Sequence, residues 1–169
     1  MRIRFSTLAV VAAAAAGFFW WRASTADVRA IKRSFRELAA LAEKGSASEN
    51  PVLAALSASR LGKLLAPSVE LSAPELYGRS WTVKREDLVR QAFAAKARAA
   101  SLSLRFDGIA ISFPSPGRAT AVGEATLSGS LPEFGGAFDG TREITVSFRR
   151  DPSGAWLATR AAAVPVAEK

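Results

Sequence analysis

The spacing of the apolar residues changes near residue 100, from a helical period to a strand period. Before this point apolar residues recur every three or four positions, as at Ile31, Phe35 and Leu38, which is typical of helices with one buried face. After it, Leu102 to Phe106 alternates apolar and polar residues, as a half-buried strand does. Helices followed by hairpin-connected strands indicate an α+β domain with an antiparallel sheet.

The predicted elements follow from this spacing and from the turn residues between them. Helices are expected from about Ala26 to Gly45, from Pro51 to about Leu65 with Asn50 as its N-cap, and from Val83 to about Ala100. Pro67 is expected to end the second helix, and a short strand is expected over Ser68 to Leu71. A meander of four antiparallel strands is expected over residues 102–113, 119–130, 141–150 and 155–164, with a glycine-rich loop from Pro132 to Gly140.

The first strand of this meander contains a change of parity. Residues 102, 104 and 106 are apolar, whereas Ile109, Ile111 and Phe113 are apolar at the odd positions. One extra residue at Asp107-Gly108 would return the apolar side chains to one face, which predicts a β-bulge there.

An uncharged apolar segment, Phe5 to Trp21, precedes the domain. As a helix its 17 residues would rise about 25 Å, and the flanking Arg4 and Arg22 can extend to the bilayer surface. We therefore predict two parts: residues 1–26, a signal anchor or signal peptide, and residues 27–169, one α+β domain. Cleavage after Ala26 is the alternative to anchoring, because small residues precede that bond.

The expected location is the inner membrane, in a single pass, with the domain in the periplasm. A short basic N-terminus before the apolar segment favours export. The basic residues that follow the segment, from Arg22 to Arg36, oppose this orientation, because positive charge is usually retained in the cytoplasm. Cleavage near Ala26 would instead give a secreted protein.

Composition excludes several kinds of chemistry. The chain has no cysteine and no histidine, so disulfides, thiolate metal sites and mechanisms that need a histidine base are absent. The net charge is +8, but the basic residues are spread along the chain. No recognised nucleic-acid-binding module is present, so this charge alone does not predict nucleic acid as a partner.

The order of elements resembles the nuclear transport factor 2-like fold, also called SnoaL-like. The features that carry the resemblance are the first helix around Ile31 to Leu41, the Leu64-Leu65-Ala66-Pro67-Ser68-Val69 passage into a strand, the bulged strand and the closing turn before Trp156. The resemblance covers about residues 27 to 166 and implies a cone, in which a curved, bulged sheet wraps three N-terminal helices. Enzymes of this fold carry Asp, Tyr or His inside the cone, and this chain has no His.

Six residues are candidates for a site. Asp107 at the predicted bulge is a weak candidate for a general base, since a bulge can direct a side chain into a site, although Asp-Gly is also an ordinary turn pair. Tyr77, Arg79 and Trp81 could line a pocket mouth or simply form a packed surface loop. Phe134 and Phe138, in the glycine-rich loop, could dock a partner, close over a ligand, or place one ring in the core.

The predicted function is non-enzymatic: a membrane-tethered domain that binds a partner protein or an apolar ligand, in a scaffold or accessory role. Its partners would be the inner membrane and a membrane protein complex or apolar ligand, with self-association as a further alternative. No cofactor and no metal site are predicted. The alternative is a small enzyme, an isomerase or hydrolase type, that uses a carboxylate base. Two or more ionisable groups meeting inside the cone would favour the enzyme, and an apolar interior would favour the binding domain.

Overall fold

The computed structural model describes residues 25–44, 50–73, 80–132 and 136–166. The chain divides into two compact units, Met1–Arg33 and Ser34–Lys169, and the second unit contains the sheet. No helix among the described ranges is both long and apolar enough to cross a bilayer. The predicted membrane segment, Phe5 to Trp21, lies outside these ranges, so its anchoring or cleavage stays a prediction.

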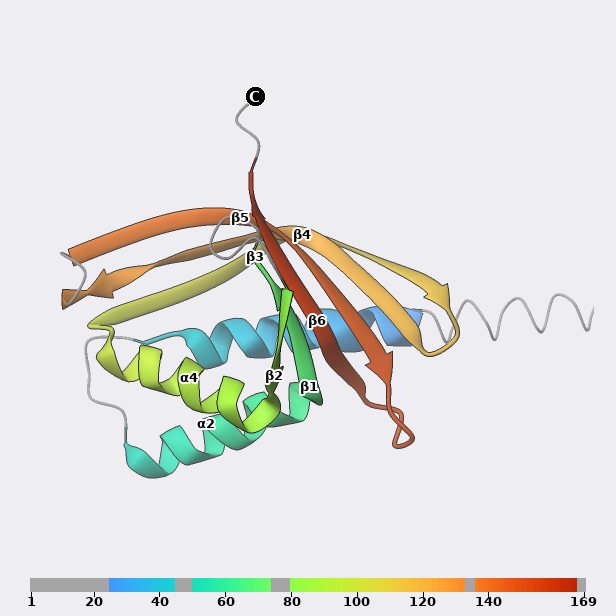
Figure 1. The fold of residues 1–169 in the computed structure, drawn as a ribbon, viewed down its shortest axis with the longest axis horizontal. Helices are drawn as coiled ribbons and strands as arrows, with labels where there is room; N and C mark the ends of the chain where they lie inside the picture. The colour runs from blue at the N-terminus through green and yellow to red at the C-terminus, as the bar shows by residue number, and fades with distance from the viewer. Residues whose placement is uncertain (1–24, 45–49, 74–79, 133–135, 167–169) are drawn as a thin grey trace, which may run out of the picture. The chain divides into compact units, whose positions relative to one another are not determined.

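The described part of the chain is α+β, with three helices packed on one sheet, as predicted. The first helix spans residues 25–42. The remaining order is α2 (Pro51–Leu64), β1 (Leu65–Ser72), β2 (Ser80–Lys84), α4 (Arg85–Arg98), β3 (Ser101–Ser115), β4 (Arg118–Leu131), β5 (Gly136–Arg150) and β6 (Trp156–Pro165). Helices α2 and α4 lie on one side of the curved sheet (Figure 1).

The sheet is mixed and has six strands, in the order β2-β1-β6-β5-β4-β3. The predicted meander, β3 to β6, is antiparallel throughout. Strand β1, which contains the short strand expected over Ser68 to Leu71, pairs in parallel with β6 and antiparallel with β2, so β2 is the strand that the prediction lacked. The predicted bulge is confirmed: the β3–β4 register shifts between Asp107 and Ala110, and Gly108 has a φ of 64°.

The start of α2 agrees with the prediction. The Asn50 side chain accepts a hydrogen bond of 2.9 Å from the Val52 N–H, and proline occupies the first turn. The end of α2 differs, because β1 begins at Leu65 and contains Pro67. The β1–β6 register is interrupted between Leu65 and Glu70, so Pro67 lies where its missing N–H removes no bond from that ladder.

Strand β2 was not predicted, and its last two residues, Val83 and Lys84, were wrongly assigned to the start of the third helix. Ser80 and Thr82 are good N-caps, but Trp81-Thr82-Val83 also favours a strand, and these residues pair with β1. Helix α4 begins later, at Arg85, and places Glu86 and Asp87 in its first turn, where negative charge is favourable.

Two lysines join the C-terminal ends of two helices. The Lys44 ammonium donates to the carbonyl oxygens of Lys96, Ala97 and Ala99, at distances of 2.9, 2.9 and 2.6 Å. In return, the Lys96 ammonium donates to the Leu41 carbonyl oxygen at 2.8 Å. Each cation therefore lies at the negative end of the other helix and satisfies carbonyls that have no partner within it.

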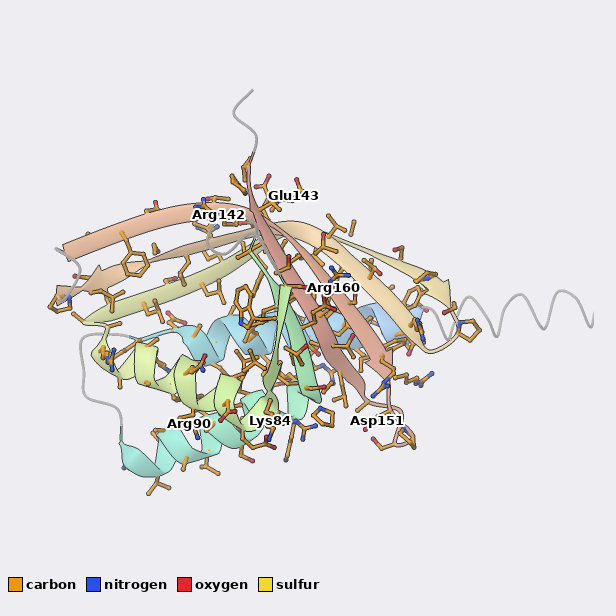
Figure 2. The ribbon with its side chains drawn as sticks, viewed as in Figure 1. Lys84, Arg90, Arg142, Glu143, Asp151 and Arg160 are labelled. Carbon is orange, nitrogen blue, oxygen red and sulfur yellow. The ribbon has the colours of Figure 1, made fainter. Side chains whose placement is uncertain are left out.

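The turn between β5 and β6 is held by Asp151, which Figure 2 shows at the end of β5. Its carboxylate accepts from the Ser153 hydroxyl at 2.6 Å and from the Ala155 N–H at 2.9 Å. The bond from Ser153 contributes most, and together these bonds lower the pKa of Asp151 below the ordinary value for an aspartate. This turn sets the start of β6 at Trp156, which is buried.

Replacing Trp156 by Ala should lower the free energy of unfolding by about 3–5 kcal/mol, because its ring is buried and lies 5.9 Å from the Phe113 ring. Urea unfolding followed by circular dichroism measures the change. Phe113→Ala is the control and should cost less, since Phe113 is 36% exposed. A loss below about 1 kcal/mol for Trp156→Ala would place this ring at the surface.

Lys96→Met should lower stability by about 1–3 kcal/mol, because the apolar stem is kept while the buried Leu41 carbonyl loses its donor. Lys84→Met, at an exposed lysine, should change stability by less than about 0.5 kcal/mol. Equal effects of the two substitutions in thermal unfolding would show that the link between the helices is not stabilising.

Candidate functional site

A cavity of about 520 Å³ lies within the Ser34–Lys169 unit, between the helices and the sheet. This volume is in the range of sites that hold small molecules, about 300–1,000 Å³. Its walls come from the first helix, α2, α4, both strands of the β1–β2 pair, and the strands β3, β5 and β6. Widely separated parts of the chain therefore build one site.

The lining is almost entirely hydrocarbon. Among the described residues that line it, Ser34 and Ser72 carry the only hydroxyl groups, and no side chain is ionisable. The other lining residues are Phe35, Leu38, Leu61, Leu64, Leu65, Val69, Leu71, Ala73, Trp81, Leu88, Ala92, Phe106, Ile144, Val146, Phe148, Ala158, Ala161, Ala162 and Ala163. Such a surface offers dispersion contacts and excludes charge.

Alanines on β6 account for the space. Ala161 is in register with Val146 of β5 on one side and with Leu71 of β1 on the other, and all three residues line the cavity. A methyl group on the central strand reaches much less far toward the helices than its valine and leucine neighbours. The interior is therefore open above β6, where larger side chains would fill it.

An aromatic cluster forms another wall. The Phe35 ring meets the rings of Phe106 and Phe148 edge to face, with centroid distances of 5.0 and 5.8 Å. Phe35 and Phe148 are each 5% exposed. This packing joins the first helix to β3 and β5, so the wall is built before any ligand is present.

Trp81 brings the cavity to the surface. It lies on β2, is paired with Leu71 of β1, and is 36% exposed while lining the cavity. Of the three candidates in this part of the sequence, Trp81 is thus placed at the site. Tyr77 and Arg79 lie outside the described residues.

Phe138 does not lie on a loop, which corrects the prediction for residues 132–140. Strand β5 begins at Gly136, and Phe138 pairs with Gly129 of β4. A Cβ atom at Gly129 would come within 3.0 Å of the Phe138 ring, so the glycine makes room for it. Phe138 does not line the cavity, and Phe134 lies outside the described residues.

Asp107 lies away from the cavity. Phe106 lines the cavity, and successive side chains of a strand point to opposite faces, so Asp107 belongs to the outer face. It is exposed and is directly opposite Glu124, which is in turn opposite Glu143. The three carboxylates form an acidic row across β3, β4 and β5. No group of described residues could hold a metal ion.

The charged side chains labelled in Figure 2 do not line the cavity either. Arg90 lies on α4, Arg160 on β6, and Arg142 and Glu143 on β5. Arg160 instead approaches Glu70 of the neighbouring strand, with 3.6 Å between guanidinium nitrogen and carboxylate oxygen. Charge is therefore located on the outside of the site.

Most of the cavity could not be anticipated from the sequence. The missed residues are chiefly the alanines of β6 and the inward leucines of α2, Leu61 and Leu64. The signal that could have indicated them is the Ala161-Ala162-Ala163 run, because three alanines in a strand leave little side-chain volume. Their significance depends on what lies opposite, which the run does not reveal.

Several solved structures resemble this chain over most of its length. A Kribbella flavida protein has a TM-score of 0.69 at 12% identity, covering 86% of this chain and 95% of its own. An NTF2-like family protein from Streptomyces avermitilis has 0.62 at 16% (86% and 99% covered). An NTF2-like protein with a cystatin-like fold from Novosphingobium aromaticivorans has 0.56 at 15% (88% and 90% covered).

These similarities show that the domain has the nuclear transport factor 2-like fold, the α+β cone predicted from the sequence. No family model and no curated protein match the chain. Identities below 20% speak for the fold alone, so the site itself has to indicate the function.

Glu124→Lys should raise the free energy of unfolding by about 0.5–1 kcal/mol at low salt, because two like-charged cross-strand pairs become opposite-charged ones. Thermal unfolding measures the change. Glu124→Gln should give a smaller gain, since it only removes repulsion. High salt should reduce both gains, and a gain that is independent of salt would show that charge is not its cause.

Proposed function

We propose that the domain binds a small apolar ligand in this cavity, as a non-enzymatic accessory domain tethered to the membrane and facing the periplasm. The observation that carries the proposal is a cavity of about 520 Å³ whose described lining contains no ionisable side chain. Burial of an apolar molecule there would remove apolar surface of both ligand and protein from water. An uncharged ligand would also leave no unpaired polar group behind.

The enzyme alternative lacks support from the same surface. A general base must lie within hydrogen-bond reach of the proton that it removes. Asp107 and Glu124 lie on the outer face of the sheet, and the described lining supplies only two serine hydroxyls. Neither hydroxyl has a histidine to activate it, because the chain contains none. These features favour binding over catalysis.

The tether rests on the sequence. Phe5 to Trp21 is uncharged, is flanked by Arg4 and Arg22, and ends in the paired tryptophans Trp20 and Trp21. A tethered domain with an apolar cavity would meet molecules that dissolve in a bilayer at high local concentration. This supports a membrane-derived ligand, which is poorly soluble in water and needs an enclosed site.

Labelling with a photoactivatable hydrocarbon, adamantyl diazirine, tests the proposal on the full chain in lipid nanodiscs. Peptide mapping should find label on strands β3, β5 and β6 at cavity residues, such as Phe106 and Val146. Ala161→Phe should reduce this labelling at least about tenfold, because the new ring occupies the space that the probe would fill. Circular dichroism checks that the variant is folded.

Ala110→Phe is the matched control, because it adds the same ring at an exposed position of β3. It should leave cavity labelling unchanged. Ala163→Val is a milder change at a second cavity residue and should give an intermediate loss. Label distributed equally over the cavity and the outer face of the sheet in the unsubstituted chain would refute the proposal.

A further inference from the structure

The outer face of α2 exposes a cluster of large apolar side chains. Val52, Leu53 and Leu56 are 66%, 57% and 55% exposed, whereas every other exposed large apolar residue in the described ranges is at most 41% exposed. The three lie in the first two turns of one helix, so they form a cluster rather than isolated contacts with water. Such clusters mark surfaces that meet a protein or a membrane.

Positive charge continues the same face. Arg60 and Lys63 follow Leu56 at spacings of four and seven residues, so they lie on the same side of the helix, and both are exposed. Helix α2 contains no acidic residue. Exposed apolar side chains can enter the acyl layer, and cations further along the same face can meet lipid phosphates, so this face suits an anionic lipid surface.

Further basic residues lie beside the end of α2. A Cβ atom on Gly62 would be 3.7 Å from the Arg85 side chain, which places the Arg85 stem against the helix. Lys84 is exposed, and in the β1–β2 register it is paired with Ser68. Ser68 is four residues after Leu64, the last residue of α2. Long basic side chains can keep their charge among phosphates while apolar neighbours enter the acyl layer.

The helix is already formed and is shared with the cavity. Its N-terminus is capped by Asn50, so docking would not require it to fold. On its inner side Leu61 and Leu64 line the cavity. One helix thus has an exposed apolar face directed away from the domain and a leucine face directed into the binding site.

We propose that α2 docks on an anionic lipid bilayer through Val52, Leu53 and Leu56, with Arg60 and Lys63 at the lipid phosphates. The cavity ligand is then an apolar molecule dissolved in that bilayer, a step that rests on the function proposed above. Helix α2 stands between the two apolar environments, the acyl layer and the cavity. Docking itself depends only on the outer face of α2 and can be tested separately.

The natural absence of cysteine makes a local probe possible. A Ser59→Cys variant of the full chain, labelled with the fluorophore NBD, places a polarity sensor at an exposed position one turn from Leu56 and leaves all three apolar residues in place. The protein is reconstituted in vesicles of phosphatidylcholine alone or of equal parts phosphatidylcholine and phosphatidylglycerol. Because the signal is local, it reports the surroundings of α2 and not those of the predicted membrane segment.

The label at position 59 should shift to shorter wavelength and be quenched by brominated lipid in the phosphatidylglycerol vesicles, with a smaller effect in phosphatidylcholine alone. Leu53→Ser with Leu56→Ser should remove the shift. Arg60→Gln with Lys63→Gln should remove its dependence on phosphatidylglycerol and on salt. The matched control is NBD on Ala110→Cys, an exposed β3 position, which should show no shift.

An unchanged label at position 59 in the phosphatidylglycerol vesicles overturns the docking proposal, as does an equal shift at position 110. A shift of the label at position 59 in native membranes, without a shift in vesicles of lipid alone, would assign this face of α2 to a protein partner. That result would also overturn the docking proposal. Diazirine labelling of the cavity in the same samples keeps the two proposals apart. Intact cavity labelling without a shift at position 59 refutes the docking proposal alone. A shift at position 59 without cavity labelling refutes the proposed ligand site alone.

Discussion

The parallel pairing of β1 with β6 is the constraint on which the cavity depends. It adds β1 and β2 to the antiparallel meander and so brings Leu71 beside Ala161 of β6, with Trp81 one strand further away. Because β1 follows α2 without a connecting residue, the same pairing also holds the end of α2 over the sheet. The cavity therefore results from the topology of the sheet. Its helices and strands have regular structure, and the way in which they are arranged leaves the interior open.

Several local features were predictable because they depend on neighbours in the sequence. The Asn50 cap, the alternation of β3 and the bulge after Asp107 each depend on a few consecutive residues, so the sequence pattern indicates them directly. Strand β2 was missed because its five residues are too few to show a period, and its Ser80 and Thr82 are equally good helix caps. The pairing of β1 with β6 joins segments about ninety residues apart, and no local pattern encodes it.

The candidate site likewise combines features that depend on neighbouring residues with features that depend on long-range pairing. Trp81 was a candidate because it stands in the connection before the predicted third helix, and it does line the cavity, although its part of that connection is a strand. Asp107 was considered as a base because it sits at a bulge, and the bulge is present, but the face on which a side chain falls is decided by register across three strands. The cavity alanines carry no signal of their own, since a small residue creates space only where nothing opposite fills it.

The paired lysines at the helix ends have a mechanical consequence. Lys44 and Lys96 fix the last turns of the first helix and α4 to each other, whereas the cavity is lined by earlier residues of both helices, such as Leu38 and Leu88. The lysine contacts restrain the C-terminal ends of these helices, so any separation between the two helices is largest away from those ends. A ligand too large for the resting cavity would accordingly displace the start of α4 more than its end at the lysine pair. The displacement would then fall at the start of α4, at Arg85, which directly follows β2, the strand that carries Trp81.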